Sequence, residues 1–130
     1  MSTPRSLFAG VLLLIAVALP ASAQTPVRVS GVYTPLGYCQ ITSLSSAVPL
    51  ITASCSTGSV PAGATMAEIC VETAAVRYRD DGTAPTTSLG MLVSPSSTVP
   101  VCFSYAITPF SAAQFIAVTG SPVVDVSFYK

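Results

Sequence analysis

Val123-Val124-Asp125-Val126-Ser127-Phe128-Tyr129 is the stretch of this sequence that decides the fold. Val124, Val126 and Phe128 alternate with Asp125 and Ser127, so an extended chain places the apolar and polar side chains on opposite faces. The pattern predicts a half-buried strand over 123–129. A connection of the length found in hairpins, Thr119-Gly120-Ser121-Pro122, joins it to the apolar stretch Phe115-Ile116-Ala117-Val118.

Similar short stretches, rich in Val, Ile, Thr, Tyr and Phe and separated by Pro and Gly, fill the rest of the chain after its first two dozen residues. They predict strands at 27–33, 38–44, 49–53, 65–71, 75–79, 89–93, 101–107, 114–118 and 123–129. Helical patterns are nearly absent, and we expect no more than one helical turn near 111–114. Regularly spaced strands of this kind predict an all-β fold, a single small antiparallel β-sandwich or jelly-roll-like domain.

The first 23 residues have the pattern of a signal peptide. Arg5 provides the positive charge, residues 7–19 are apolar, and Ala21-Ser22-Ala23 offers small residues for cleavage. The apolar run of about 13 residues is shorter than the ~20 that cross a bilayer as a helix. We therefore expect a signal helix at 1–23 and a mature, exported domain at 24–130, with an uncleaved anchor as the alternative.

The charge content limits the partners of the mature chain. Removal of Arg5 with the leader leaves four basic and five acidic residues, a net charge of −1. Such a balance does not favour nucleic acid or anionic lipid as a partner. Only 8% of the whole chain is charged, against about 25% in typical soluble proteins. A surface with so little charge is easily buried, so we expect a protein partner, with self-assembly as one form.

The chain has four cysteines, Cys39, Cys55, Cys70 and Cys102, and all lie in the exported part. An even number in an oxidising compartment predicts two disulfides. Three pairings are possible, and we favour Cys39–Cys55 with Cys70–Cys102. A four-cysteine zinc site is the alternative, but it usually needs closely spaced pairs of ligands, and these cysteines are far apart in the sequence.

The segment Val76-Arg77-Tyr78-Arg79-Asp80-Asp81-Gly82 predicts a strand that ends in a turn. Alternation places Arg77 and Arg79 on one face of the strand. Asp81-Gly82 is a strong turn signal, because Gly accepts positive φ and Asp hydrogen-bonds the local backbone. We expect a structural turn held by pairs between the arginines and Asp80 or Asp81. Calcium binding by the two aspartates is the alternative, which the adjacent arginines disfavour.

Residues suited to catalysis are scarce. The chain has no histidine, the commonest general base and metal ligand. No serine lies in a G-x-S-x-G or S-x-x-K motif, and no Gly-rich phosphate loop precedes a helix. Glu68 and Glu72 share a face, but tryptophan is absent and no sugar-binding platform accompanies them. We expect no catalytic residues, no cofactor and no metal.

From Val60 onwards the sequence resembles small β-rich structural or decoration-like proteins of tailed phages and prophages. The resemblance is carried by 60–64, 67–70, 90–91, 115–116 and 126–130, and above all by 76–86, with Arg-Asp-Asp-Gly-Thr-Ala-Pro-Thr at 79–86. It implies a compact β domain associated with a virion, without catalytic residues. An export signal departs from that pattern, and three explanations follow from it. The chain is a domesticated relative that is secreted, a phage product that works in the cell envelope, or a protein whose N-terminus is not cleaved.

These observations lead to three hypotheses. The first is a non-enzymatic structural or interaction module, phage- or prophage-related and exported to the periplasm, the cell exterior or a virion surface. The alternative is a secreted ligand- or glycan-binding domain of adhesin type. A small hydrolase is the third, and the missing histidine counts against it.

Overall fold

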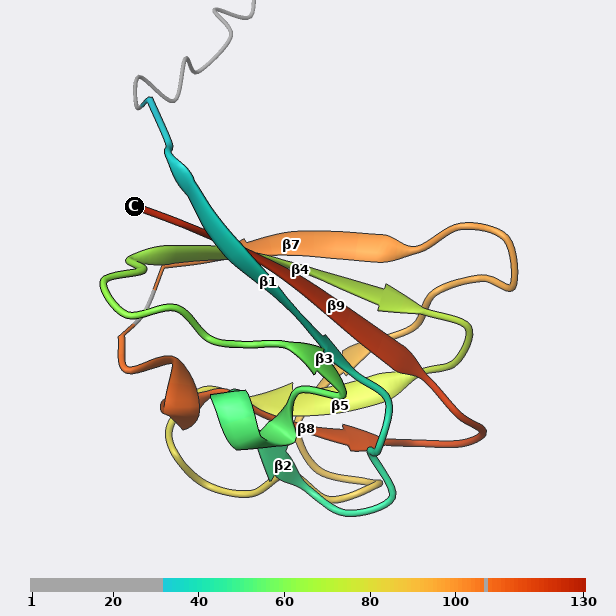
Figure 1. The fold of residues 1–130 in the computed structure, drawn as a ribbon. Helices are drawn as coiled ribbons and strands as arrows, with labels where there is room; N and C mark the ends of the chain where they lie inside the picture. The colour runs from blue at the N-terminus through green and yellow to red at the C-terminus, as the bar shows by residue number, and fades with distance from the viewer. Residues whose placement is uncertain (1–31, 107) are drawn as a thin grey trace, which may run out of the picture. The chain divides into compact units, whose positions relative to one another are not determined.

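Two antiparallel sheets pack face to face in the computed structural model, which describes residues 32–106 and 108–130 (Figure 1). The five-stranded sheet has the order β3 (Thr57–Gly58), β1 (Pro35–Ile41), β9 (Val123–Tyr129), β4 (Met66–Glu72) and β7 (Val101–Tyr105). The four-stranded sheet has the order β2 (Val48–Pro49), β8 (Gln114–Ala117), β5 (Val76–Arg79) and β6 (Met91–Val93). The expected all-β sandwich is confirmed.

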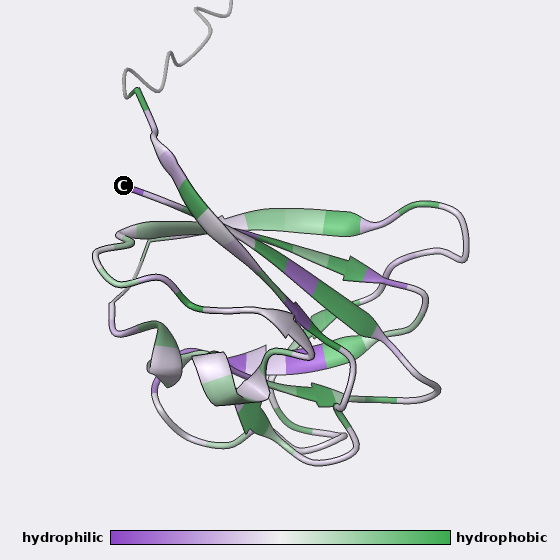
Figure 2. Cartoon of the chain, in the orientation of Figure 1, coloured by the Kyte–Doolittle hydropathy of each residue, from purple (hydrophilic) through white to green (hydrophobic). Residues whose placement is uncertain are grey.

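Strand β9 lies at the centre of the five-stranded sheet and has the bounds that its alternation predicts. Val126 stands opposite Cys39 of β1 on one side and Ile69 of β4 on the other. Val124, Val126 and Phe128 are fully buried, whereas the residues between them are only partly buried. Figure 2 shows hydrophobic and hydrophilic residues along this strand. The strands on both sides of β9 also place buried apolar residues opposite its buried ones, so one face of the sheet is apolar.

The core lies between the two sheets and contains no buried polar or charged residue among those described. Its largest fully buried side chains are Phe115, Phe128, Ile41, Leu50, Ile69, Val71, Val76, Val124, Val126 and Cys39. Aromatic contacts link the layers. The ring of Tyr78 on β5 stacks on Phe103 of β7 at 5.0 Å, and Phe128 meets Phe110 edge to face at 5.4 Å.

Six of the other predicted strands are present with ends shifted by one to three residues, and one is much shorter than expected. The strand predicted at 49–53 is wrong beyond Pro49, since the chain turns into a 3₁₀ helix, η1 (Thr52–Ser54). This turn is needed to bring Cys55 back to Cys39 on β1. Strand β3, with two residues, was not predicted. The prediction at 27–33 falls largely outside the described residues, and Val32 and Tyr33 are not in a strand.

The connection between β8 and β9 does not form a hairpin. The two strands belong to different sheets, so residues 118–122 cross from one layer to the other. The connection predicted at 119–122 is one residue longer in the structure, and its length alone does not decide whether two strands pair. The expected helical turn is confirmed as a second 3₁₀ helix, η2 (Phe110–Ala112). No helix in the described part of the chain has the length and apolar character to cross a membrane.

Gly58 of β3 is the glycine that the fold requires most strictly. Its φ is +81°, and a Cβ at this position would lie 2.0 Å from the carbonyl oxygen of Tyr38. A side chain there is excluded by the neighbouring backbone. The close approach allows β3 to cover part of the edge of β1, with Cys39 opposite Gly58.

Candidate functional site

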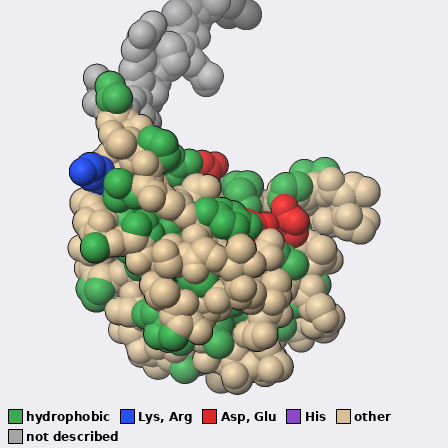
Figure 3. Space-filling view, viewed as in Figure 1, with side chains coloured by type: hydrophobic (Ala, Val, Ile, Leu, Met, Phe, Trp, Pro, Cys, Tyr) green, Lys and Arg blue, Asp and Glu red, His purple; other side chains and the backbone are tan. Residues whose placement is uncertain are grey.

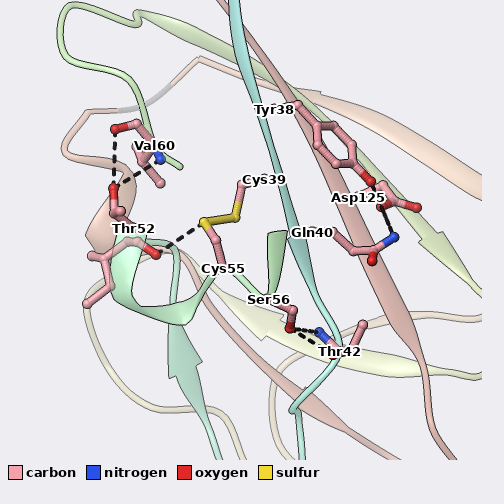
Figure 4. Close-up of a disulfide and its surroundings, with 10 residues drawn as sticks. Tyr38, Cys39, Gln40, Thr42, Thr52, Cys55, Ser56, Val60 and Asp125 are labelled. Atoms are coloured by element: carbon pink, nitrogen blue, oxygen red, sulfur yellow. Dashed lines mark hydrogen bonds between the residues drawn. A yellow bond between two sulfur atoms is a disulfide. The ribbon is translucent and has the colours of Figure 1, made fainter. Parts of the chain in front are cut away.

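Both disulfides connect the pairs of cysteines favoured by the sequence. Cys39 on β1 is bonded to Cys55, just after η1 (Figure 4), and Cys70 on β4 is bonded to Cys102 on β7. The sulfur of Cys39 is in the core, whereas Cys102 is exposed on the outer face of the five-stranded sheet. Cys70 and Cys102 stand directly opposite each other, so their bond fixes β7 to its only neighbouring strand. Two disulfides are typical of an oxidising environment.

The predicted structural turn contains one arginine–aspartate pair instead of two. Arg79 donates to both carboxylate oxygens of Asp81, which also accepts the N–H of Thr83 at 3.0 Å. Gly82 has φ +79°, as the turn signal predicts. Arg77 does not pair with an acidic residue. It donates to the carbonyl oxygens of Thr87 and Gly90 at 3.1 and 2.7 Å and so holds the loop before β6.

This arrangement predicts that the carboxylate of Asp81 stays ionised to a lower pH than usual. The hydrogen bond from Arg79, aided by the Thr83 N–H, lowers its pKa from 3.8 to about 2. A pKa lowered by folding means that the pair stabilises the fold above pH 3.8 and that this contribution is lost as the pH falls through about 2. We expect Arg79→Gln to raise the pKa of Asp81 toward 3.8 in a carboxyl-carbon NMR titration.

Arg77→Gln is the matched control for this titration. It removes the same charge from the same strand face, but Arg77 contacts carbonyl oxygens and not Asp81. The pKa of Asp81 should therefore stay near 2. A rise of equal size in both variants would contradict the specific pair and would indicate a general effect of net charge.

A polar cluster that the sequence did not reveal lies on the outer face of the five-stranded sheet. The Tyr38 hydroxyl donates to the carboxylate of Asp125, and the Gln40 amide donates to the same oxygen at 3.0 Å (Figure 4). The hydrogen bond to Asp125 is the main cause that raises the pKa of Tyr38. A tyrosine held protonated at an exposed position is a weaker acid than usual. The cluster supplies hydrogen bonds and contains no nucleophile paired with a base.

The other carboxylates on this face do not form a pair suited to acid–base work or metal binding. Glu68 and Glu72 are both exposed on β4. Glu68, Cys70 and Cys102 form the one group of three potential metal-ligand residues in the described part of the chain. The two sulfurs of this group are bonded to each other, so Glu68 alone has a free ligand atom. A thiolate site would first require reduction of the disulfide.

A shallow groove of about 410 Å³ lies between η1 and η2. Its lining is mostly apolar and includes Leu50, Val60 and Phe110, while Thr52 and Ser111 add hydroxyl groups. The Thr52 hydroxyl already accepts the Val60 N–H at 3.1 Å. The groove has the size of a small-molecule site, but it holds no charged side chain to orient a ligand.

The most unusual surface is one long side of the sandwich, where both sheets end. Strands β6 and β7 are the edge strands of their sheets. Phe103 of β7 stacks on Tyr78 of β5, and Tyr78 stands opposite Met91 of β6. The two edge strands therefore lie on the same side of the sandwich. The exposed apolar residues there are Leu89, Met91, Leu92, Val99 and Val101. We call this surface, formed by these five residues and the outer edges of β6 and β7, the open side.

The open side has few of the features that usually protect sheet edges: β6 is short, with three residues, and Pro100 directly precedes β7. Strand β7 has five residues, Val-Cys-Phe-Ser-Tyr, with neither charge nor proline. No described residue pairs with its outer edge. Natural edge strands are commonly shielded by charged residues, prolines, bulges or a covering loop. Val99, just before β7, is 61% exposed, so an apolar side chain borders this edge, and Leu92 is 52% exposed on the outer face of β6.

The charged residues within the strands are separated between the two outer faces. Glu68, Glu72 and Asp125 lie on the five-stranded sheet, whereas Arg77 and Arg79 lie on the four-stranded one. From Gly82 to Val124 the sequence has no charged residue, and this stretch includes the whole open side. On the face drawn in Figure 3, most of the visible surface is uncharged. The open side therefore offers apolar contact and backbone hydrogen bonds, and has no charged residue of its own.

No family model, curated protein or solved structure matches this sequence. Any function must therefore be argued from the surface itself.

Proposed function

We propose that the chain is an exported, non-enzymatic structural module that binds other copies of itself through the open side. The two disulfides and the signal-like N-terminus support export. The scarcity of charge and the absence of histidine support a role in binding over one in catalysis. Self-association is favoured because an uncharged, weakly polar surface loses little hydration when it is buried.

The observation that carries this proposal is the unprotected edge of β7 beside exposed apolar residues. An edge strand offers a row of N–H and C=O groups to any extended chain that comes close. Exposed apolar patches on soluble proteins commonly mark binding sites. Here both features coincide, and the bond between Cys70 and Cys102 keeps the edge strand in place. A partner therefore meets a preformed surface, which reduces the entropic cost of association.

We expect the mature chain, residues 24–130, to show a mass that rises with concentration in sedimentation equilibrium. The double variant Leu92→Lys with Val101→Lys should weaken this association by about tenfold or more, since two charges in an apolar contact cost over 1.4 kcal/mol.

Ile51→Lys is the matched control, because Ile51 is an exposed apolar residue outside the open side. It should leave the association unchanged. A mature chain that stays monomeric at every concentration would overturn the proposal. Equal weakening by Ile51→Lys would assign the association to general hydrophobicity instead of the open side.

The groove between η1 and η2 supports a second candidate function, a secreted ligand-binding domain. Its mostly apolar lining, with hydroxyl groups from Thr52, Thr108 and Ser111, fits a small, largely apolar ligand better than a glycan, which usually needs an aromatic platform. Binding of a fluorescent apolar probe that Val60→Asp abolishes would favour this candidate. No binding of the probe, together with no binding on a glycan array, would exclude it.

A relation to phage structural proteins is part of the first proposal and rests on the sequence resemblance alone. Capsid and tail genes beside the coding gene would support a virion role for the self-associating surface. A neighbourhood of secretion or envelope genes would instead support a cellular one.

A further inference from the structure

We propose that the strand bound by the open side is the N-terminal segment, residues 27–31, of a neighbouring copy. This inference rests on the proposed self-association and specifies its geometry. Each copy then carries one donor segment and one acceptor edge, and the copies join head to tail. Such a head-to-tail contact produces open chains of copies, or a ring where the rotation between copies closes.

The sequence of the segment suits an added strand. Val27 and Val29 alternate with Arg28 and Ser30, a period of two that gives an extended chain one apolar face. The segment leads into Val32 and Tyr33, which the described domain leaves exposed, Val32 by 99%. Val32 therefore lies outside the core formed by the described residues.

The side-chain positions match on both faces of the extended sheet. A strand added beside β7 with its valines inward would cover the gap between the sheets, where Met91 and Val101 are exposed. Arg28 would then lie on the outer face. That face carries Glu68, Glu72 and Asp125, and none of the three has an ion-pair partner among the described residues. The cation of the donor thus complements the acidic face of the acceptor.

The length of the segment favours a neighbouring copy over the same chain. Strand β1 is separated from β7 by β9 and β4. Reaching the outer edge of β7 means crossing four strand spacings, about 19 Å, which takes about six extended residues. After cleavage at Ala23, ten residues precede Thr34, which is held by Lys130 at the end of the sheet. Too few remain to form a strand along β7 as well as the crossing.

Two variants of the mature chain test the proposal by complementation. The donor variant carries Val27→Asp and Val29→Asp, and the acceptor variant carries Leu92→Lys and Val101→Lys. We expect each variant alone to be monomeric. An equal mixture should contain a one-to-one dimer, with twice the monomer mass in sedimentation equilibrium, because the intact donor of one variant fits the intact edge of the other.

Further variants keep this test interpretable. Gln24→Asp with Thr25→Asp adds the same two charges outside the alternating stretch and should leave the association of the mature chain unchanged. Thermal melting of each variant should match that of the parent, since the acceptor substitutions lie at exposed positions. If the double acceptor variant melts early, Val99→Lys alone takes its place, because Val99 is 61% exposed just before β7.

The outcomes separate the donor proposal from the proposed function. A donor variant that associates as strongly as the parent would overturn the assignment of residues 27–31, while the open side would remain the contact. Two monomeric variants that do not combine would also overturn it, and would favour a symmetric contact of open sides. A parent chain that never associates would overturn both proposals.

Discussion

Phe128→Ala should lower the free energy of unfolding by about 3–5 kcal/mol, the range for a fully buried aromatic side chain. Phe128 has no exposed surface and lies on β9, the central strand of its sheet. Its ring contacts Phe110 of η2 edge to face. The variant therefore loses apolar burial and an aromatic contact, and leaves a cavity between a strand and a helical turn that cannot easily collapse.

Ser127→Ala is the control for this prediction. It changes the adjacent residue, which points to the outer face and is partly exposed, and should alter the free energy of unfolding by no more than about 0.5 kcal/mol. Urea denaturation followed by tyrosine fluorescence measures both variants. A loss below about 1.5 kcal/mol for Phe128→Ala would contradict its position in the closely packed core.

The burial pattern of β9 can be predicted from its sequence, whereas the path of the connection before β9 cannot, and both have the same cause. Alternation along β9 decides which side chains are buried, because the parity of a strand is a local property. The partner of a strand is decided by the whole set of strands. Phe115 and Phe128 both bury their rings in the same core, yet they come from opposite sheets. Nothing in the sequences of β8 and β9 distinguishes two strands in opposite sheets from two strands paired in a hairpin.

The open side was missed for a similar reason. Leu89, Met91 and Leu92 lie in the stretch 89–93 that was predicted as a strand, and β6 forms over its last three residues, Met91–Val93. Their exposure results from the position of β6 at the edge of its sheet. The polar cluster was also not predictable, since Tyr38 and Asp125 are 87 residues apart in the sequence. The disulfide pairing was the favoured one of three possibilities, and the sequence alone could not decide between them, because each joins segments that were expected to be strands or their connections.

Removal of the disulfide Cys39–Cys55, which closes the shorter loop, should lower the free energy of unfolding at least as much as removal of Cys70–Cys102. Loop entropy alone predicts a loss of about 4 kcal/mol for the pair Cys70–Cys102 and about 3 kcal/mol for Cys39–Cys55, whose sequence separations are 32 and 16. Serine at position 39 also places a hydroxyl in the core, at an additional cost of about 1–3 kcal/mol. Serine at position 102 is exposed to water and costs nothing further.

We therefore expect Cys39→Ser with Cys55→Ser to be at least as destabilising as Cys70→Ser with Cys102→Ser in urea denaturation. The corresponding alanine pairs separate the two contributions. Changing serine to alanine at Cys39 and Cys55 should recover about 1–3 kcal/mol, whereas the same change at Cys70 and Cys102 should recover little. If both alanine pairs behave alike relative to serine, the sulfur of Cys39 is not in the core. The disulfide Cys70–Cys102 holds β7 to β4, so its loss should also weaken self-association. If a variant without this disulfide associates as strongly as the parent, the acceptor edge is rigid without the bond.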